Sequence, residues 1–228
     1  PPEAVVTIYN SKVLAELTGF CFSENIPMVP YGAGGGYNMG VVPMAPSITV
    51  SLKGMQEIGA VENMTITAQG GAAYKDIVAK VNRAGFVLRC QPNTPRAAFS
   101  GIIASGSNGG KRIHDVLICG KAVVSPGKRV AFQVTREEQN QINSEAFLVY
   151  RKFWGVSDAA LLAPILQTSQ PILPASLFIG SEGTSGFITE GTMMVERQKA
   201  FAQTTALHFY NLEKAMEFVV GARSVYSP

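Results

Sequence analysis

Cysteine and histidine are scarce in this sequence. Its three cysteines, Cys21, Cys90 and Cys119, form an odd set without a C-x-x-C pair, and its only histidines are His114 and His208. An odd number of cysteines without a closely spaced pair argues against a disulfide framework. The small number of cysteines and histidines argues against a zinc site. We therefore expect buried thiols in a reducing compartment and no metal.

Charged residues are few, at 15% of the sequence, and long apolar runs are absent. Lys and Arg number 19 against 16 Asp and Glu, a net charge of +3, and no block of five or six basic residues occurs. This balance argues against nucleic acid as the main partner. No apolar stretch approaches the roughly 18 residues that span a bilayer, so no transmembrane segment is expected. Any targeting peptide is expected to lie outside this sequence.

Hydrophobic residues, at 46% of 228, are sufficient for a sizeable core in one large or two small domains. Glycine is abundant and gathers in two distant segments, Pro30-Tyr-Gly-Ala-Gly-Gly-Gly-Tyr-Asn-Met-Gly40 and Gly180-Ser-Glu-Gly-Thr-Ser-Gly-Phe-Ile-Thr189. The first follows a short expected strand that ends at Val29. Glycines directly after a strand let backbone N–H groups approach a ligand closely, and this pattern favours a diphosphate.

Spacing argues against the two commonest phosphate-binding motifs. The dinucleotide fingerprint G-x-G-x-x-G fails after Gly34 and Gly36, because Met39 stands where the third glycine belongs. Residues 106–111 also miss the P-loop, since Ser105 takes the first glycine position and Arg112 stands where Ser or Thr should hold magnesium. The sequence therefore predicts neither a Rossmann site nor ATP hydrolysis.

Hydrophobic periodicity predicts mixed helices and strands, an α+β arrangement. One helix should begin at Asn10 or Ser11 and run toward Asn25, and another should contain Ile77 and Val81 and end at Gly85. Strands are expected over residues 5–8, 28–29, 48–52, 65–68, 122–124, 129–134 and 187–195. The pattern leaves 136–176 unassigned, and it predicts a strand at 204–209 and a helix at 211–222 that open a second domain.

Three motifs carry a family resemblance. Val29-Pro-Tyr-Gly-Ala-Gly-Gly-Gly36 is similar to a P-x-G-x-G-T loop, and the segment from Gln91 to Gly106 resembles D-P-G-S-x-x-A-T-I-G-G-N-I-A-T-N. The most specific match is Leu177-Phe-Ile-Gly-Ser-Glu-Gly-Thr-Ser-Gly-Phe-Ile-Thr-Glu190, which resembles L-F-V-G-S-E-G-T-L-G-I-I-T-E. Together they resemble the N-terminal half of FAD-linked oxidases of the vanillyl-alcohol-oxidase/PCMH superfamily, in the D-lactate dehydrogenase, glycolate oxidase and D-2-hydroxyglutarate dehydrogenase group.

The resemblance implies a PCMH-type FAD-binding domain over residues 1–198, with α+β subdomains at about 1–85 and 86–198. Residues 199–228 would begin a truncated substrate-binding cap domain. Some members tether FAD through a histidine where this chain has Gly35, so the cofactor should be non-covalent. The family's substrate-binding arginine and histidine-rich motif belong to the C-terminal half, so the catalytic residues stay unassigned here.

The resemblance also implies which residues contact FAD. They are Pro30, Tyr31, Gly32, Ala33, Gly34, Gly35, Gly36, Tyr37 and Asn38; Pro92, Asn93, Thr94, Ala97, Ala98, Ser100, Gly101, Ala104, Ser105 and Gly106; and Glu182, Gly183, Gly186, Phe187 and Ile188.

Other candidates have less support. Lys111 and Arg112 could offset phosphate charge or lie in a solvated loop, His114 could touch the flavin site or be structural, and Tyr150 or Trp154 could face the flavin or belong to the core. Two segments depart from the family's sequence motifs: residues 111–115, where a motif is shortened, and residues 136–176, where a motif is not recognisable.

The expected reaction is oxidation of a D-2-hydroxy acid, with electrons passed to a quinone, a cytochrome or an electron-transfer flavoprotein. An alkylglycerone-phosphate synthase-like flavoenzyme and a non-catalytic flavin-fold subunit are the alternatives. A homo-oligomer is possible. The resemblance fits a mitochondrial location in a eukaryote, and otherwise a cytoplasmic one or one peripheral to the inner membrane.

Overall fold

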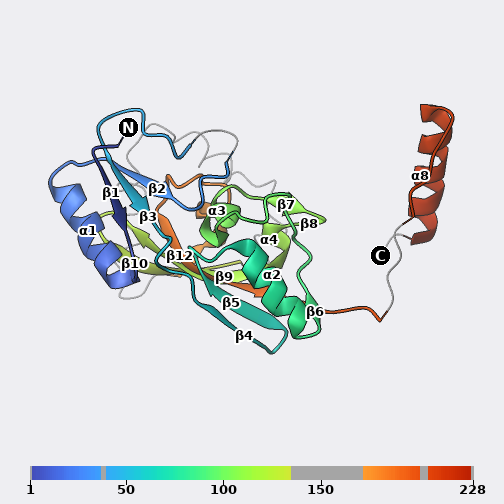
Figure 1. Cartoon of the computed structure of the whole chain (residues 1–228), viewed down its shortest axis with the longest axis horizontal. Coiled ribbons are helices and arrows are strands. Elements are labelled where there is room, and N and C mark those ends of the chain that lie inside the picture. Colours follow the sequence, from blue (N-terminus) through green and yellow to red (C-terminus); the bar gives the residue numbers. More distant parts are fainter. Residues whose placement is uncertain (1, 37–39, 135–171, 201–204, 227–228) are drawn as a thin grey trace. The chain divides into compact units, whose positions relative to one another are not determined.

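The computed structural model describes residues 2–36, 40–134, 172–200 and 205–226 (Figure 1). The chain divides into two compact units, Pro1–Gln198 and Lys199–Pro228. Helices and strands are mixed along the first unit, as the α+β expectation requires. Within the described residues, no helix combines the length and the apolar character needed to cross a membrane.

A three-stranded parallel sheet opens the first unit. Its strands β1 (Ala4–Thr7), β2 (Met28–Tyr31) and β3 (Ile48–Ser51) lie in the order β1-β3-β2. Helix α1 (Ser11–Ser23) connects β1 to β2, and the Asn10 side chain caps it by accepting from the N–H of Val13 at 2.9 Å. The predicted β-α-β unit is confirmed, and β3 lies between its two strands.

A six-stranded sheet forms the rest of the framework, in the order β11-β10-β9-β12-β5-β4. All neighbours are antiparallel except β10 and β11. The strands are β4 (Ile58–Glu62), β5 (Thr65–Gln69), β9 (Leu117–Val124), β10 (Lys128–Gln133), β11 (Ile172–Pro174) and β12 (Phe187–Met194). Since β4 and β5 belong to this sheet, the change from one sheet to the other falls between β3 and β4, earlier than the expected boundary near residue 85.

Short elements complete the first unit. They are α2 (Tyr74–Arg83), β6 (Phe86–Val87), α3 (Phe99–Ala104), β7 (Asn108–Gly109), β8 (Lys111–Arg112), α4 (Ile113–Val116), η2 (Ala175–Leu177) and β13 (Glu196–Arg197). Figure 1 shows α2 and α3 over one face of the larger sheet.

Two hydrophobic cores lie on opposite faces of the six-stranded sheet. On β9, Ala122 and Val124 belong to the core under α2 and α3, whereas Val123 belongs to the core with Leu14 of α1 and Val50 of β3. Alternation along a strand sends successive side chains to opposite faces. The six-stranded sheet therefore separates the two cores and contributes side chains to both.

The second unit contains α8 (Leu212–Tyr226), which confirms the predicted helix, and the rings of Phe209 and Phe218 lie 5.5 Å apart. The strand expected at 204–209 is wrong for its described part, 205–209, which forms no strand. A strand needs a hydrogen-bonding neighbour, and the described residues of this unit contain none.

The three cysteines form no disulfide. Cys21 and Cys90 are buried as expected, whereas Cys119 is only half-buried.

Candidate functional site: a cofactor pocket

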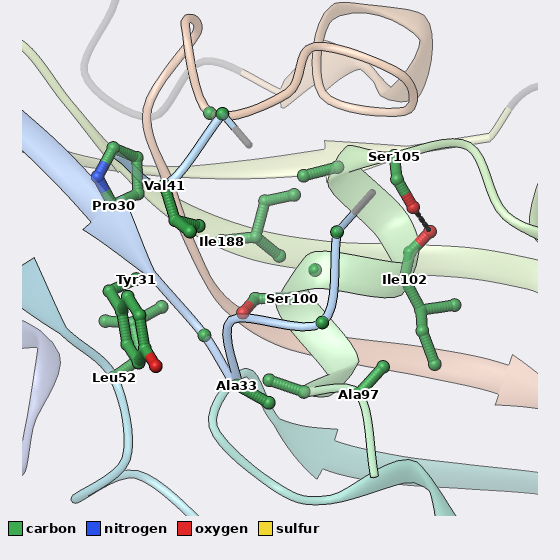
Figure 2. Close-up of a pocket in the computed structure, with 18 of the residues that line it drawn as sticks. Pro30, Tyr31, Ala33, Val41, Leu52, Ala97, Ser100, Ile102, Ser105 and Ile188 are labelled. Carbon is green, nitrogen blue, oxygen red and sulfur yellow. Dashed lines mark hydrogen bonds between the residues drawn. The ribbon is translucent and has the colours of Figure 1, made fainter. Parts of the chain in front are cut away.

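Three segments far apart in the sequence line one pocket (Figure 2): the loop after β2, the region around α3, and the loop before β12. The expected contact residues that line it are Pro30, Tyr31, Gly32, Ala33, Gly34, Gly35, Gly36, Thr94, Ala97, Ala98, Ser100, Gly101, Ala104, Ser105, Glu182, Gly183, Gly186, Phe187 and Ile188. All three motifs thus meet at one place.

The loop after β2 presents unsatisfied backbone donors. Pairing between β2 and β3 ends at Tyr31, whose carbonyl accepts from the N–H of Leu52 at 3.1 Å. Beyond it, the N–H groups of residues 32–36 form no hydrogen bond with the described part of the chain. Consecutive free N–H groups beside a hollow suit an anionic ligand such as a diphosphate.

Close packing explains why this loop is glycine-rich. A Cβ on Gly32 would lie 2.9 Å from the Cβ of Ala98, and Gly34 has a φ of +72°. A Cβ on Gly34 would also lie 2.5 Å from the Tyr31 hydroxyl. Side chains at these two positions would therefore disturb the loop itself.

Hydrogen bonds tie the loop before β12 to the end of α3. The N–H of Gly180 donates to the Ile103 carbonyl at 3.2 Å, and that of Glu182 donates to the Ala104 carbonyl at 2.8 Å. Gly183, with a φ of +87°, packs against Pro30 of β2. Ser181, between the two donors, is only 3% exposed and does not line the pocket, which leaves it poorly placed to act as a nucleophile.

Backbone hydrogen bonds hold the start of helix α3 against the segment that follows β5. The N–H of Ser100 donates to the Gly70 carbonyl at 2.8 Å, and that of Phe99 donates to the Ala72 carbonyl at 2.9 Å. A Cβ on Gly70 would collide with the Ile188 carbonyl and lie 3.1 Å from the Ser100 Cβ. The absence of a side chain at Gly70 therefore allows α3 and β12 to pack closely together.

Some expected contacts lie elsewhere. Tyr37 and Asn38 fall outside the described residues. Pro92, Asn93 and Gly106 do not line the pocket. The neighbouring Gln91 donates its N–H to the Gly109 carbonyl at 2.7 Å, which pairs that segment with β7, and Gly106 turns the chain after α3 at a φ of +62°.

Four lining residues were not predicted, Val41, Leu52, Ile102 and Ser107, and a fifth, Gly40, was predicted only as the end of the glycine segment. Leu52 and Ile102 have the character of core residues. The position of Leu52 directly after a parallel strand was a usable signal, because ligands bind beyond the carboxyl ends of such strands. Ser107 and Ser105 share a hydrogen bond of 2.7 Å at the pocket (Figure 2).

The basic segment after α3 has a local role. Arg112 pairs with Asp115 at 2.9 Å, and its hydrogen bonds hold the pKa of that carboxyl below the usual range. His114 is largely buried, with its Nδ1 atom 4.0 Å from Asp115. Neither these residues nor Lys111 line the pocket. Tyr150 and Trp154 lie outside the described residues.

Comparison with known proteins identifies the ligand of this fold. Residues 2–132 match the FAD binding domain family, which is more than half of the chain. The chain belongs to this FAD-binding family. Its cofactor is therefore FAD, and covalent attachment is not indicated: the described pocket lining contains no histidine and no cysteine.

Curated relatives of this FAD-binding chain match at low identity. A probable mitochondrial D-lactate dehydrogenase from Danio rerio is 22% identical over 96% of the chain and 40% of its own length. The glycolate oxidase subunit GlcD of Bacillus subtilis is 22% identical over 96% of the chain and 42% of its own length. The chain thus spans about two fifths of these relatives.

Solved structures show the same PCMH-type flavoenzyme fold. Alkyldihydroxyacetonephosphate synthase matches with a TM-score of 0.67 and 18% identity, over 97% of this chain and 36% of that one. The 6-hydroxy-D-nicotine oxidase of Arthrobacter nicotinovorans matches with a TM-score of 0.60 and 15% identity, over 85% of this chain and 36% of that one.

The pocket fits FAD on structural grounds. It combines free N–H groups in residues 32–36 with apolar side chains such as Val41, Leu52 and Ile188 (Figure 2). A dinucleotide with an anionic diphosphate and a flat apolar ring needs both kinds of surface.

Proposed function

We propose that this protein is the FAD-binding portion of a dehydrogenase that oxidises a D-2-hydroxy acid of the lactate, glycolate or 2-hydroxyglutarate type. The observation that carries the proposal is the similarity, across 96% of the chain, to proteins named D-lactate dehydrogenase and glycolate oxidase. The convergence of three glycine-containing segments on one pocket supports it.

The residues of the pocket bind and orient the cofactor. We assign the diphosphate to the N–H groups of residues 32–36, and we assign water exclusion to Val41, Leu52, Ile102 and Ile188. The hydroxyls of Ser100, Ser105 and Ser107 offer hydrogen bonds to polar groups of the bound molecule. FAD held by these residues would supply the hydride-accepting chemistry that oxidation of a hydroxy acid requires.

Substrate capture needs groups that the described lining does not provide. Its residues include no Arg, Lys or His to bind a carboxylate or to take a hydroxyl proton, and Glu182 is its only carboxylate. We therefore place the carboxylate-binding group and the base outside this lining. A quinone, a cytochrome or an electron-transfer flavoprotein would take the electrons, and a mitochondrial setting is proposed if the source is a eukaryote.

Anaerobic reduction of the bound flavin tests the proposal. The protein purified from its native source is mixed in turn with D-lactate, glycolate, D-2-hydroxyglutarate and L-lactate, and the visible flavin bands are recorded. Bleaching by a D-acid or glycolate, but not by L-lactate, is expected. Flavin bands that persist with every acid would refute the dehydrogenase and leave a flavoprotein of another activity or a non-catalytic subunit.

A second candidate is an alkylglycerone-phosphate synthase-like activity, because a synthase of that kind shares the fold over 97% of this chain. Such a reaction exchanges an acyl for an alkyl group. The two candidates separate on substrate class, since exchange on an acylated lipid precursor would occur without hydroxy-acid oxidation.

A further inference from the structure

Lys53 lies at the sheet edge where the glycine loop begins. Tyr31 of β2 pairs in register with Ser51 of β3, and the chain continues through the pocket residue Leu52 to Lys53. Because β2 and β3 are parallel, Lys53 and the loop at 32–36 leave the same edge of the sheet. Lys53 is exposed, with its Nζ 5.2 Å from the centroid of the Tyr31 ring.

The charges that line the pocket explain why a cation at the position of Lys53 would matter. The described lining contains no basic side chain, whereas a diphosphate brings negative charge. Backbone N–H groups offer dipoles but no net charge. A cation close to the loop would therefore favour binding of the diphosphate in this pocket.

Three other basic residues of this unit are paired with carboxylates. Arg112 pairs with Asp115, Lys121 pairs with Glu190 and Arg89 pairs with Glu196, all within 3 Å. Lys53 forms no ion pair with any described residue. Its ammonium instead lies over an aromatic ring, a contact that holds a cation in place without neutralising it.

The Tyr31 ring links this cation to the loop. Its hydroxyl lies beside Gly34, since a Cβ on Gly34 would be only 2.5 Å away. We propose that Lys53, held against Tyr31, is a positioning residue that supplies the positive charge for the cofactor's diphosphate. This inference depends on the diphosphate binding at residues 32–36, as assigned in the proposed function.

Ligands with and without phosphate test the inference. Dissociation constants of FAD, ADP and riboflavin are measured by titration calorimetry on the full protein freed of cofactor, at low and high salt. For Lys53→Met, we expect FAD and ADP to bind roughly three- to tenfold more weakly at low salt. Riboflavin, which has no phosphate, should bind unchanged, and the salt dependence for FAD should become shallower.

Two matched variants complete the test. Lys53→Arg keeps the charge and should restore FAD affinity, and Lys12→Met removes an exposed lysine of α1 that does not line the pocket and should change nothing. Equal losses for riboflavin, or for Lys12→Met, would overturn the inference, as would unchanged FAD binding in Lys53→Met.

The FAD affinity of Lys53→Met and the bleaching of the flavin bands test the role of Lys53 and the dehydrogenase activity separately. Weaker FAD and ADP binding in Lys53→Met, together with flavin bands that no hydroxy acid bleaches, would support the role of Lys53 and refute the dehydrogenase. Bleaching by a hydroxy acid with an unchanged FAD affinity in Lys53→Met would support the dehydrogenase and refute the role of Lys53.

Discussion

Gly183 packs directly against Pro30, and a Cβ on Gly183 would lie 2.6 Å from the Pro30 Cγ. Gly183 belongs to the loop before β12, and Pro30 belongs to β2 of the other sheet. The contact therefore brings the third glycine-containing segment against the first. It joins the two sides of the cofactor pocket, so its loss should affect both folding and binding.

Replacing Gly183 by Ala should lower the free energy of unfolding by about 2 to 4 kcal/mol, since the new methyl meets Pro30 and the φ of +87° disfavours any side chain. Urea unfolding of the cofactor-free protein measures the loss. Gly180→Ala is the matched control: its φ is +78°, yet an added Cβ meets no atom within 4 Å. It should lose only about 1 kcal/mol. Equal losses would show that the contact with Pro30 is unimportant.

Gly101 tests whether the pocket is the FAD site. It lies in α3 and lines the pocket, and an added Cβ meets no atom within 4 Å. Gly101→Ala should raise the free energy of unfolding by about 0.5 to 1 kcal/mol, because alanine favours a helix. Gly101→Leu should fold but bind FAD at least about tenfold more weakly, since its side chain would occupy cofactor space.

The control for Gly101→Leu is Gly221→Leu in α8, where an added Cβ also meets open space. It should leave FAD binding unchanged. Flavin absorbance after gel filtration gives the occupancy of each variant. Full FAD occupancy in a folded Gly101→Leu protein would contradict the assignment of this pocket.

Local patterns predicted the parts of the fold that depend on nearby residues. Asn10 caps α1 and Phe187 begins β12, because capping and alternation are properties of a few adjacent residues. Pairing between distant strands has no such local signature. The sequence therefore did not show that β5 pairs with β12, or that Leu52 reaches the pocket.

The candidate site was predictable chiefly through motif resemblance. Glycine clustering alone pointed to a phosphate ligand after β2 and to the segment at 180–189, while the resemblance brought in the segment at 92–106 and the individual contacts. Pro92 was included by position within its motif, but its segment pairs with β7 instead of lining the pocket. Lys53 was not predicted, because its contact with the Tyr31 ring depends on the register of β2 with β3.

The thiol of Cys90 should make stability fall at alkaline pH. Burial, with a smaller contribution from the Asp115 carboxylate, raises the pKa of Cys90 to about 11 from its ordinary value of 9.0. The folded state thus holds the proton more tightly than the unfolded state. This contribution, on the order of 2 to 3 kcal/mol, is complete below pH 9 and is lost as pH rises toward 11.

Urea unfolding at pH 8, 9, 10 and 11 measures this loss. Burial also raises the pKa of Tyr74, so part of the alkaline decline will persist in any cysteine variant. Cys90→Ala should show a shallower decline than the wild-type protein between pH 9 and 11. Identical slopes in the two proteins would show that Cys90 does not titrate in this way.

Residues 199–228 should be dispensable for the stability and FAD binding of the first unit. They form a separate unit, and every described pocket residue lies between Pro30 and Ile188. A chain ending at Gln198 should keep its FAD affinity and its free energy of unfolding to within about 0.5 kcal/mol.

A chain ending at Val195 is the informative comparison. It also loses β13, which pairs with β6, the ion pair of 2.6 Å between Arg89 and Glu196, and the hydrogen bond from the Gln198 N–H to the Gly85 carbonyl. The ion pair is exposed and contributes little, so the backbone bonds should account for most of a loss of about 1 to 3 kcal/mol. Equal stability of the two truncated chains would show that β13 does not support the fold. A large loss on truncation at Gln198 would instead show that the first unit depends on residues 199–228.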